Sequence, residues 1–413
     1  MTPVQPVRGT QSLLGEDADR LAAVVAAFDR VRRLFGFKRV EVPTIEQTGV
    51  FARTIGETTD VVSKEMYTFE DRGGESITLR PEFTAGICRA YLSEGWQQYA
   101  PLKVAAHGSA FRYERPQKGR FREFHQLDAE IIGAAEPQAD VEILSLGYQL
   151  LIELGIADGV TLQLNTLGDS ESRQAWRQAL IEFFSDRANE LSEDSQERLQ
   201  RNPLRILDSK DIRDVGVSSD APLIDEHLTA EAADFLSAVE AGLDAAEIPY
   251  ERNYKLVRGL DYYRHTAFEF VTDRLGSQGT VIGGGRYDGL IETLGGPYTP
   301  AVGWAAGIER LAMMIDAPAT EAVDVAIVAE NRGREAEAVK FGAMLRRNNI
   351  SVEIYVTGSP RKRYDRALKT SPDAVVSFDL RDGVRSGGFR LLKPESDGAQ
   401  RAHTIWDSFG FEP

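Results

Sequence analysis

Apolar residues recur every three or four positions between Glu16 and Phe35, which predicts a helix with one buried face. The next segment, 37–42 (FKRVEV), alternates apolar and polar residues as a strand does, and Pro43 ends it. The same alternation in 102–113 and 124–133, on either side of a polar loop, predicts a long hairpin. The chain therefore begins as a mixture of helices and paired strands.

The middle of the chain contains two polar, strongly helical regions, 170–199 and 230–246. The segments before them are predicted as a strand from Ser76, a helix from Thr84, a helix over 143–154 and a strand over 160–164. The segments after them are predicted as strands within 255–272 and 280–284 and an apolar helix over 303–315. The polar helical regions therefore look like an insertion, about residues 170–249, in an α+β domain.

A domain boundary is expected at Pro318 and the small, acidic stretch that follows it. Beyond it the pattern alternates between strand (323–329, 351–355 and 374–378) and helix (334–348 and 361–370). Strands that alternate with helices favour a mostly parallel sheet. We therefore expect a first domain over 1–319 and a separate α/β domain over 322–413.

The chain of 413 residues carries a formal net charge of −16, and a phosphate backbone repels an acidic surface. A nucleic-acid partner would need local basic patches, and two are present, at 112–122 and 361–369. A solvated charged surface is the simpler interpretation of either patch by itself.

The single cysteine, Cys88, excludes an internal disulfide, and the five histidines show no zinc-ligand spacing. No run of eighteen apolar residues is present, and the N-terminus does not resemble a secretion signal. These features predict a cytoplasmic protein with no structural metal and no membrane partner.

The predicted hairpin brings a cation, carboxylates, an amide and an aromatic ring to one face. These are Arg112 and Glu114 on its first strand, and Phe124, Gln126, Asp128 and Glu130 on its second. Burying several charges in a core is costly, so we interpret the face as a polar ligand site. From the two-residue period alone, a ligand site and an ordinary solvent-facing surface are about equally good interpretations.

Two further segments carry candidate chemistry. LVRGLDYY (256–263) places an arginine beside a glycine and two tyrosines, and the arginine favours a site over simple strand packing. GGGRYDG (283–289) lacks both the dinucleotide fingerprint and the phosphate-loop lysine, so its glycines are better explained as turn or close-packing positions.

Taken together, these segments resemble class II aminoacyl-tRNA synthetases and, among them, histidyl-tRNA synthetases. The matching segments are VEVPTIEQTGV (40–50), TLRPE (78–82), FRYERPQKGRFREFHQLDAEIIG (111–133), NPLRILDSK (202–210), LVRGLDYY (256–263), GGGRYDGL (283–290) and AAGIERL (305–311). The resemblance implies an antiparallel sheet of six or seven strands flanked by helices, a homodimer, and an anticodon-binding role for the C-terminal domain.

The activity implied by the resemblance is the activation of histidine by ATP, with Mg²⁺, followed by transfer to the 3′ end of tRNA(His). It assigns catalysis to Arg258 and Arg112, with Arg258 on the opposite side of the α-phosphate. The implied ATP-binding residues are Arg112, Glu114, Arg120, Phe124 and Arg310. The implied histidine-binding residues are Glu82, Phe83, Thr84, Arg112, Gln126, Glu130, Arg258, Tyr262, Tyr263 and Tyr287.

The implied tRNA contacts lie in two places. The resemblance puts Arg115, Gln117 and Lys118 against the acceptor end, and we infer Arg361, Lys362 and Arg363 near the anticodon. Segment 359–376 departs from the family pattern, which leaves open which bases it reads.

Two alternatives remain. One is a catalytically inactive paralogue that regulates ATP phosphoribosyltransferase in histidine biosynthesis, and the other is an RNA-binding protein without catalysis. Paralogues of the first kind generally lack the anticodon domain and lose the arginine of LVRGLDYY, whereas this chain keeps Arg258 and about ninety residues after the catalytic core.

Overall fold

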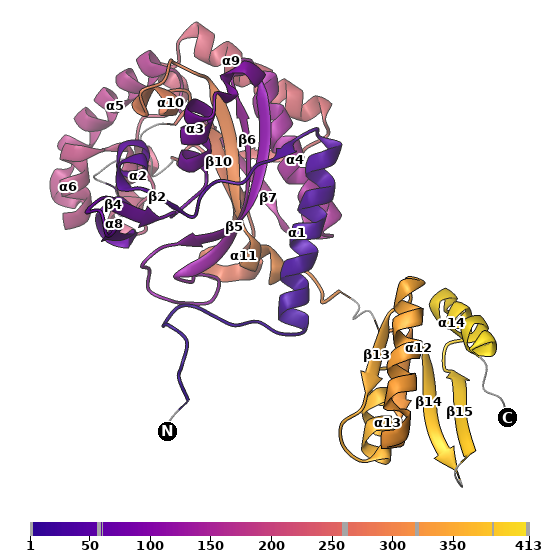
Figure 1. Cartoon of the computed structure of the whole chain (residues 1–413). Coiled ribbons are helices and arrows are strands. Elements are labelled where there is room, and N and C mark those ends of the chain that lie inside the picture. Colours follow the sequence, from indigo (N-terminus) through magenta and orange to yellow (C-terminus); the bar gives the residue numbers. More distant parts are fainter. Residues whose placement is uncertain are drawn as a thin grey trace. The chain divides into compact units, whose positions relative to one another are not determined.

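The computed structural model describes residues 3–55, 59, 61–257, 263–318, 322–381 and 384–409. The chain forms two compact units, Met1–Pro318 and Ala319–Pro413. The first unit contains a large sheet with helices on its faces, and the second contains a smaller sheet with its own helices (Figure 1).

The first unit is built on an eight-stranded sheet with the order β1-β5-β6-β11-β10-β9-β7-β8. Its strands are β1 (Lys38–Arg39), β5 (Leu102–Phe111), β6 (Glu123–Ile132), β7 (Thr161–Thr166), β8 (Tyr250–Arg252), β9 (Arg264–Val271), β10 (Thr280–Arg286) and β11 (Ala301–Gly307). All pairs from β5 to β7 are antiparallel, whereas the short strands β1 and β8 pair in parallel at the edges. The expected antiparallel sheet is therefore present. Strand β1 falls within the strand predicted over 37–42, whereas β8 and the parallel pairing of both edge strands were not predicted.

The predicted long hairpin is confirmed as β5 and β6, which pair from Leu102↔Ile132 to Phe111↔Glu123. Strand β5 ends at Phe111, so Arg112 and Glu114 lie beyond the paired region rather than on it. They belong to the loop that joins the two strands.

The helix predicted over 303–315 is wrong in its first part, because Ala301–Gly307 is the strand β11. Only Ile308–Ala312 is helical, as α11. The small residues in 303–307 are compatible with both a helix and a strand, and pairing with the neighbouring strands of the sheet favours the strand. Strand β11 lies between β6 and β10 and bonds to both, so its backbone groups are satisfied in extended form.

Two apolar cores lie on opposite faces of this sheet. On one face, α1 (Glu16–Leu34), α4 (Pro137–Glu153), α9 (Ala230–Ala245) and α11 bury residues such as Phe28, Leu146 and Trp304. Figure 1 shows α1 and α4 lying side by side on this face. On the other face, α3 (Thr84–Ser93) and α10 (Leu290–Thr293) pack with the inserted helices, and Trp176 is buried there.

A small second sheet precedes α3. Its order is β2-β4-β3, with β2 (Ile45–Gln47), β3 (Tyr67–Glu70) and β4 (Ser76–Leu79), and α2 (Thr48–Ile55) follows β2. The predicted strand from Ser76 and the predicted helix from Thr84 are both confirmed. Together they fix the start of α3 beside the large sheet.

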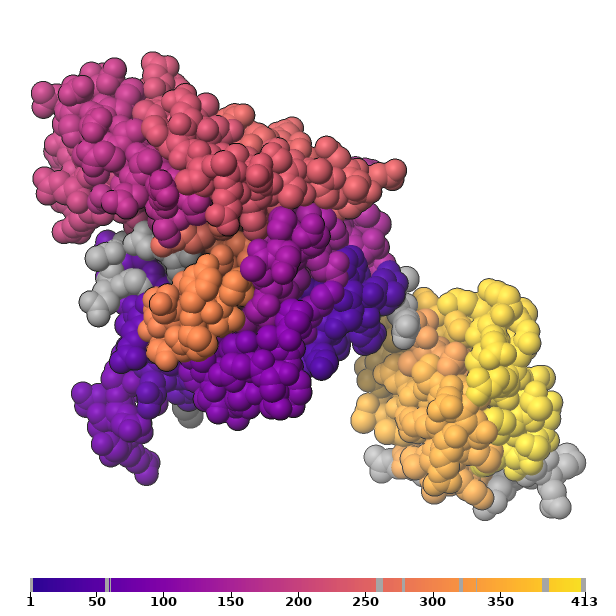
Figure 2. Space-filling view, turned by 90° about the horizontal axis from the view of Figure 1, so that it is seen from above, coloured from indigo at the N-terminus to yellow at the C-terminus, as the bar shows by residue number. Residues whose placement is uncertain are grey.

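Residues 170–249 are mostly helical, as predicted, and form a continuous lobe of the first unit in Figure 2. The α-helices of this segment are α5 (Ser170–Ser185), α6 (Glu193–Arg201), α7 (Leu204–Leu207), α8 (Ile212–Val217) and α9. Asp169 caps the N-terminus of α5, and its side chain accepts the Ser172 N–H at 2.8 Å. Thus α9 covers one face of the sheet, while α5 and α7 contribute to the core of the other.

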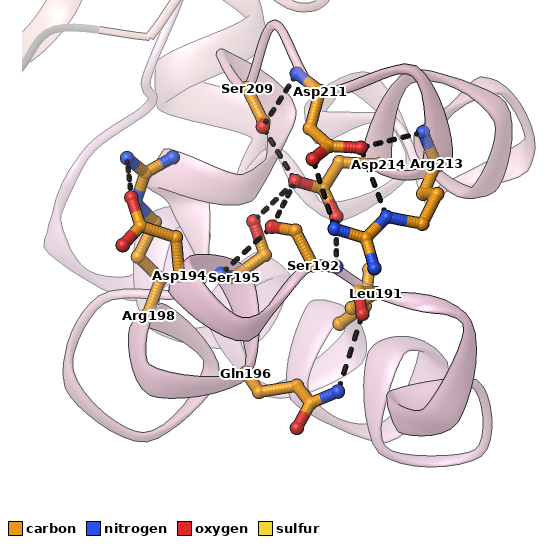
Figure 3. A network of polar contacts seen from close by, with 10 residues as sticks. All are labelled: Leu191, Ser192, Asp194, Ser195, Gln196, Arg198, Ser209, Asp211, Arg213 and Asp214. Atoms are coloured by element: carbon orange, nitrogen blue, oxygen red, sulfur yellow. Dashed lines mark hydrogen bonds and ion pairs between the residues drawn. The ribbon is translucent and has the colours of Figure 1, made fainter.

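A single buried carboxylate joins three segments of the insertion (Figure 3). Asp214 is fully buried and accepts the backbone N–H of Ser192 at 2.8 Å. It also accepts the hydroxyl groups of Ser192 and Ser195, each at 2.7 Å, and of Ser209 at 2.6 Å. Burial acts to raise the pKa of Asp214, but these hydrogen bonds outweigh it and hold the pKa below its ordinary value.

We predict that Asp214→Ala lowers the free energy of unfolding by about 3 kcal/mol, because several buried donors lose their acceptor together. The depressed pKa means that this stabilisation is fully present above the unfolded-state pKa of about 3.9 and is lost as the pH falls through the lower folded-state pKa. Urea unfolding followed by circular dichroism, at neutral and acid pH, measures both effects.

Asp194→Ala is the matched control, since Asp194 lies in the same insertion but is 82% exposed and pairs with Arg198 at the surface. Its expected cost is below about 0.5 kcal/mol. Equal stability of the two alanine variants at neutral pH would contradict the role of Asp214 as a buried acceptor.

The second unit has a four-stranded sheet with the order β13-β12-β14-β15. Its elements are β12 (Val325–Ala329), α12 (Glu335–Arg347), β13 (Val352–Tyr355), α13 (Pro360–Lys369), β14 (Ala374–Arg381), β15 (Val384–Leu391) and α14 (Asp397–Ser408). Strand β12 pairs in parallel with β13 and β14, which confirms the predicted α/β order, and β15 adds an antiparallel edge. Among the described residues, no helix is both long and apolar enough to cross a membrane.

Candidate functional site

A cavity of about 370 Å³ lies over the central strands of the first unit. Its walls come from β6, β9, β10 and β11, from the starts of α3 and α11, and from the loop between β5 and β6. The lining residues are Glu82, Thr84, Arg112, Glu114, Gly119, Arg120, Phe121, Phe124, Gln126, Tyr263, Glu269, Thr280, Val281, Gly283, Tyr287, Gly303, Trp304, Ala305, Gly307, Glu309 and Arg310. Segments from widely separated parts of the sequence therefore meet at one cavity.

Glycines allow the strands beside this cavity to pack closely. A Cβ on Gly303 would lie 1.5 Å from the Oε2 atom of Glu130, and a Cβ on Gly284 would lie 2.1 Å from the carbonyl oxygen of Gly303. Neither position can accept a side chain without displacing its neighbours. Gly284 and Gly285 of GGGRYDG thus serve close packing within β10, one of the two roles that the sequence favoured.

One end of the cavity is rich in hydrogen-bond acceptors. Glu130 is fully buried behind two lining residues, and its carboxylate accepts the hydroxyl of Thr84 at 2.7 Å and the hydroxyl of Tyr287. Burial raises the pKa of Glu130 to about 7, against the opposing effect of these two donors. The carboxyl group is therefore poised to change charge near neutral pH.

Glu82 and Gln126 supply further acceptors at this acceptor-rich end of the cavity. The Oε1 atom of Glu82 accepts the backbone N–H of Ala85 at 3.0 Å, and burial raises the pKa of Glu82. The side-chain oxygen of Gln126 is buried and has no hydrogen-bond partner within the described residues. Tyr263 is also nearly buried here. A ligand group rich in N–H donors suits this end.

The structure corrects one expectation about the hairpin face. Asp128 was expected to face a ligand because buried charges are costly, but it is fully buried and does not line the cavity. Glu130 is also fully buried, but it contacts the lining residues Thr84 and Tyr287. Burial raises the pKa of both carboxyl groups, so proton uptake reduces the cost of placing them inside the protein. Gln126, on the same face of β6, does line the cavity.

The opposite end of the cavity is basic and aromatic. The Nε atom of Arg112 donates to the carbonyl oxygen of Pro81 at 3.0 Å, and its guanidinium lies 5.4 Å from the ring centroid of Phe124. These contacts fix the guanidinium beside the ring.

Two more arginines meet at this basic end. Arg310 donates to the carbonyl oxygens of Gly119 at 3.2 Å and Thr280 at 2.8 Å, while Arg120 pairs with Glu114 at 2.6 Å. Burial lowers the pKa of Arg310, and the charge of Arg120 lowers it further. Positive charges crowded in this way favour an anion between them.

Glu309 is a cavity residue that the sequence did not single out. It is 5% exposed and accepts the backbone N–H of His125 at 3.0 Å, and its Oε1 atom lies 2.8 Å from Nδ1 of His125. The hydrogen bond to Glu309 raises the pKa of His125. Its position next to Arg310 in AAGIERL was the available signal.

Arg286 is a second residue that sequence reasoning did not assign. It is fully buried, and its Nε atom donates to Asp140 at 3.0 Å while Nη1 donates to Asp288 at 3.2 Å. The two carboxylates raise the pKa of Arg286 against the effect of burial. This ion-pair cluster ties β10 to α4 and supports the cavity from below the sheet.

Two of the expected ATP- and histidine-binding residues that the structure describes, Phe83 and Glu130, do not line the cavity. Phe83 is 1% exposed within the core cluster and does not line it. Arg258 and Tyr262 lie outside the described residues. The remaining expected ATP and histidine residues line the cavity, except Glu130, which lies directly behind Thr84 and Tyr287.

The residues expected to contact tRNA are divided between the two units. Arg115, Gln117 and Lys118 are exposed on a tight loop, where Gly119 adopts a φ of 73° and the Gln117 N–H donates to the Arg120 carbonyl at 3.0 Å. This geometry turns their side chains toward solvent.

In the second unit, Arg361 and Lys362 are exposed on α13, but Arg363 is not. Arg363 is 6% exposed and donates to the carbonyl oxygens of Gly358, at 3.0 Å, and Ala329. Its expected role in tRNA contact is therefore corrected to a structural one, because its donors already bind the backbone.

A family model described as histidyl-tRNA synthetase matches residues 9–311 of this chain. A relative from Novosphingobium aromaticivorans, named histidine–tRNA ligase, is 62% identical over 399 residues, which cover 96% of this chain and 94% of the relative.

Solved structures show the same likeness. Apo histidyl-tRNA synthetase from S. aureus superposes with a TM-score of 0.76 and 32% identity, over 91% of each chain. A structure from Bacillus halodurans, described as an ATP phosphoribosyltransferase regulatory subunit/histidyl-tRNA synthetase, has a TM-score of 0.60 and 21% identity over 87% of this chain and 96% of its own. At that identity the second likeness shows the fold alone.

Proposed function

The chain belongs to the histidyl-tRNA synthetase family, and we propose that the cavity described above is where it joins histidine to ATP. It is an aminoacyl-tRNA ligase that uses ATP as a substrate. In the first step the histidine carboxylate attacks the α-phosphorus of ATP, which forms histidyl-adenylate and releases pyrophosphate. In the second step a hydroxyl of the 3′-terminal ribose of tRNA(His) attacks the histidyl carbonyl, and AMP leaves.

The observation that carries this proposal is the arrangement of one acceptor-rich end and one guanidinium-rich end around a single cavity. Histidine brings an ammonium group and a ring N–H, which need acceptors, while ATP brings phosphates, which need cations. The two ends therefore match the two substrates.

At the acceptor-rich end, we assign Glu130 and Tyr263 to the imidazole ring, with Tyr287 lining its pocket. Glu82, Thr84 and Gln126 serve the ammonium and carboxylate end of the amino acid. The unpartnered side-chain oxygen of Gln126 supports this assignment, since a buried acceptor without a donor is costly until a ligand supplies one. The family resemblance also assigns Tyr262, which lies outside the described residues, to the histidine pocket.

At the basic end, Arg112 binds the α-phosphate, and Arg120 and Arg310 bind the outer phosphates. Phe124 stacks on adenine and Glu114 accepts its amino group. Glu114 forms an ion pair with Arg120 in this structure. When ATP binds, this ion pair is replaced by contacts of Glu114 with the adenine amino group and of Arg120 with the phosphates. ATP enters as its magnesium complex, and Arg258 acts from the opposite side of the α-phosphate.

Transfer to tRNA uses residues outside the cavity. Arg115, Gln117 and Lys118 are exposed on the loop that also carries Arg120, so acceptor-end binding and ATP binding share one segment. Arg361 and Lys362 present two cations on α13 for the anticodon region. The C-terminal α/β unit is proposed as the anticodon-binding domain, and a cytoplasmic homodimer as the working form.

The regulatory paralogue is the weaker alternative. Relatives named histidine–tRNA ligase match nearly the whole chain, including the C-terminal unit that such paralogues generally lack. The likeness to the regulatory-subunit structure extends to the fold alone.

Histidine-dependent pyrophosphate–ATP exchange tests the function directly. We expect exchange with histidine and none with phenylalanine or glutamine, because neither supplies both ring nitrogens to the acceptor-rich end. A purified protein that forms the native fold but shows no exchange with histidine would overturn the ligase proposal.

A further inference from the structure

Asp128 occupies an unusual position beneath the cavity. It lies on β6 between Gln126 and Glu130, on the same face, and pairs across the sheet with Ala106 and Ala305. Its side chain is fully buried. The cavity is lined by Gln126 above it rather than by Asp128 itself, so a bound substrate does not reach this carboxyl group.

Neither carboxyl oxygen of Asp128 has a hydrogen-bond donor within the described part of the chain. The charged and titratable groups that act on it or on its partner Glu130 are Arg80, Glu82, Cys88, Glu130 and Tyr287. The guanidinium of Arg80 uses Nε for the Ser109 carbonyl and Nη1 for the Val42 carbonyl, each at 2.8 Å. The hydroxyl of Tyr287 donates to Glu130.

An ionised carboxylate in this position would be buried without a partner, which costs several kcal/mol. Retaining the proton removes that cost. Burial raises the pKa of Asp128 well above its ordinary value, and the charges of Glu130 and Glu82 raise it further, while Arg80 acts in the opposite direction. A neutral Asp128 then has one O–H group to donate.

The acceptor for that proton is the neighbouring carboxylate. Asp128 and Glu130 lie two residues apart on the same face of β6, and both are fully buried. A hydrogen bond between them acts to raise the pKa of Asp128 and to lower that of Glu130, but two ionised carboxylates have no proton to share. Glu130 already accepts hydroxyl groups from Thr84 and Tyr287, so its ionised form gathers donors. A third donor completes a set that favours a negative charge on Glu130.

We propose that Asp128 remains protonated at neutral pH and donates its carboxyl hydrogen to Glu130, as a positioning residue that favours the ionised form of Glu130, which accepts a ring N–H of histidine. The last part rests on the proposed function, because it uses histidine as the ligand. The protonation state of Asp128 does not rest on it, since it follows from burial and from the missing donors.

Two variants separate this proposal from a direct role in binding the ammonium group. Asp128→Asn keeps the shape and offers an amide N–H in place of the carboxyl O–H, so it should retain exchange and the KM for histidine within about threefold of the parent. Asp128→Ala removes the donor, so the KM for histidine should rise about tenfold while the KM for ATP stays unchanged.

The pH dependence of kcat/KM for histidine is a second measurement, and a purely structural role of Asp128 would not change it. Loss of the donor raises the pKa of Glu130, whose present value is about 7, so the acid limb of kcat/KM for histidine should shift to higher pH in Asp128→Ala. The asparagine variant should keep the limb near that of the parent. If Asp128→Asn loses histidine activation as fully as Asp128→Ala, or if both variants match the parent, the proposal is wrong.

An infrared measurement tests the proton without any substrate. At a pH about two units above the pKa of Glu130, the ligand-free protein should show the C=O stretch of a protonated carboxyl group, and Asp128→Asn should lose it. An unchanged spectrum in the asparagine variant would show that Asp128 is ionised. Failure of the parent protein to exchange with histidine would instead count against the proposed function and leave the infrared result to decide on Asp128.

Discussion

Replacing Arg112 with alanine is expected to lower histidine-dependent pyrophosphate–ATP exchange by about 10²–10³-fold, as when one preorganised oxyanion donor is removed. Attack on the α-phosphorus increases negative charge on its oxygens, and a guanidinium already held in place stabilises that charge without reorganising. Arg112 is held by the Pro81 carbonyl at 3.0 Å and by the ring of Phe124. The loss should appear in kcat more than in the KM for histidine.

Arg112→Lys should recover only part of the rate, because it keeps the charge but loses the planar fork of donors. Arg30→Ala is the matched control, since Arg30 is half-exposed on α1 and pairs with Glu153 outside the cavity. Its exchange rate should equal that of the parent. An Arg112→Ala protein within about threefold of the parent would remove Arg112 from the reaction.

Gly303→Ala is expected to reduce histidine activation by about 10²-fold or more, although it adds a single methyl group. That methyl would lie 1.5 Å from Oε2 of Glu130 and 2.7 Å from the carbonyl oxygen of Ala129, so the carboxylate must move. A displaced Glu130 loses the hydroxyl groups of Thr84 and Tyr287 and no longer lies where the proposed imidazole binds. Exchange assays over a range of histidine concentrations measure the effect.

Gly289→Ala provides a matched control in the same region. Gly289 has no atom within 4 Å of an added Cβ, its φ is −89°, and it does not line the cavity. Both variants should be compared by thermal unfolding, so that a lost site can be separated from a lost fold. Normal histidine activation by a folded Gly303→Ala protein would contradict the close approach of Glu130 to Gly303.

Sequence periodicity predicted the fold best where one period dominates a long segment. The hairpin β5–β6 and helix α1 follow from alternation and from a three- to four-residue repeat, and both are present. Prediction failed at Ala301–Gly307, where Gly303 and Ala305 carry little information about period. Neighbouring strands, which the local sequence does not describe, decided that segment.

The candidate site was predicted unevenly for a similar reason. Family motifs identified Arg112, Gln126 and Arg310, and the structure brings them to one cavity. The exposure of each side chain could not be predicted in the same way. Arg363 lies in a basic segment and was expected to be solvent-exposed, but it is nearly buried against backbone carbonyls. The motifs contained Glu309 but gave no sign of its contact with His125, which lies far away in the sequence.

The sequence by itself determined the family, the elements with a long regular period and about half of the residues that line the cavity, since motifs and periodicity are local properties of the chain. Only the tertiary structure decided the protonation chemistry beneath the cavity. Asp128 and Glu130 appear in sequence as two ordinary acids on one strand face. Their pKa values depend on burial and on donors from Thr84 and Tyr287, because desolvation and hydrogen bonding act through space between segments that the chain keeps far apart.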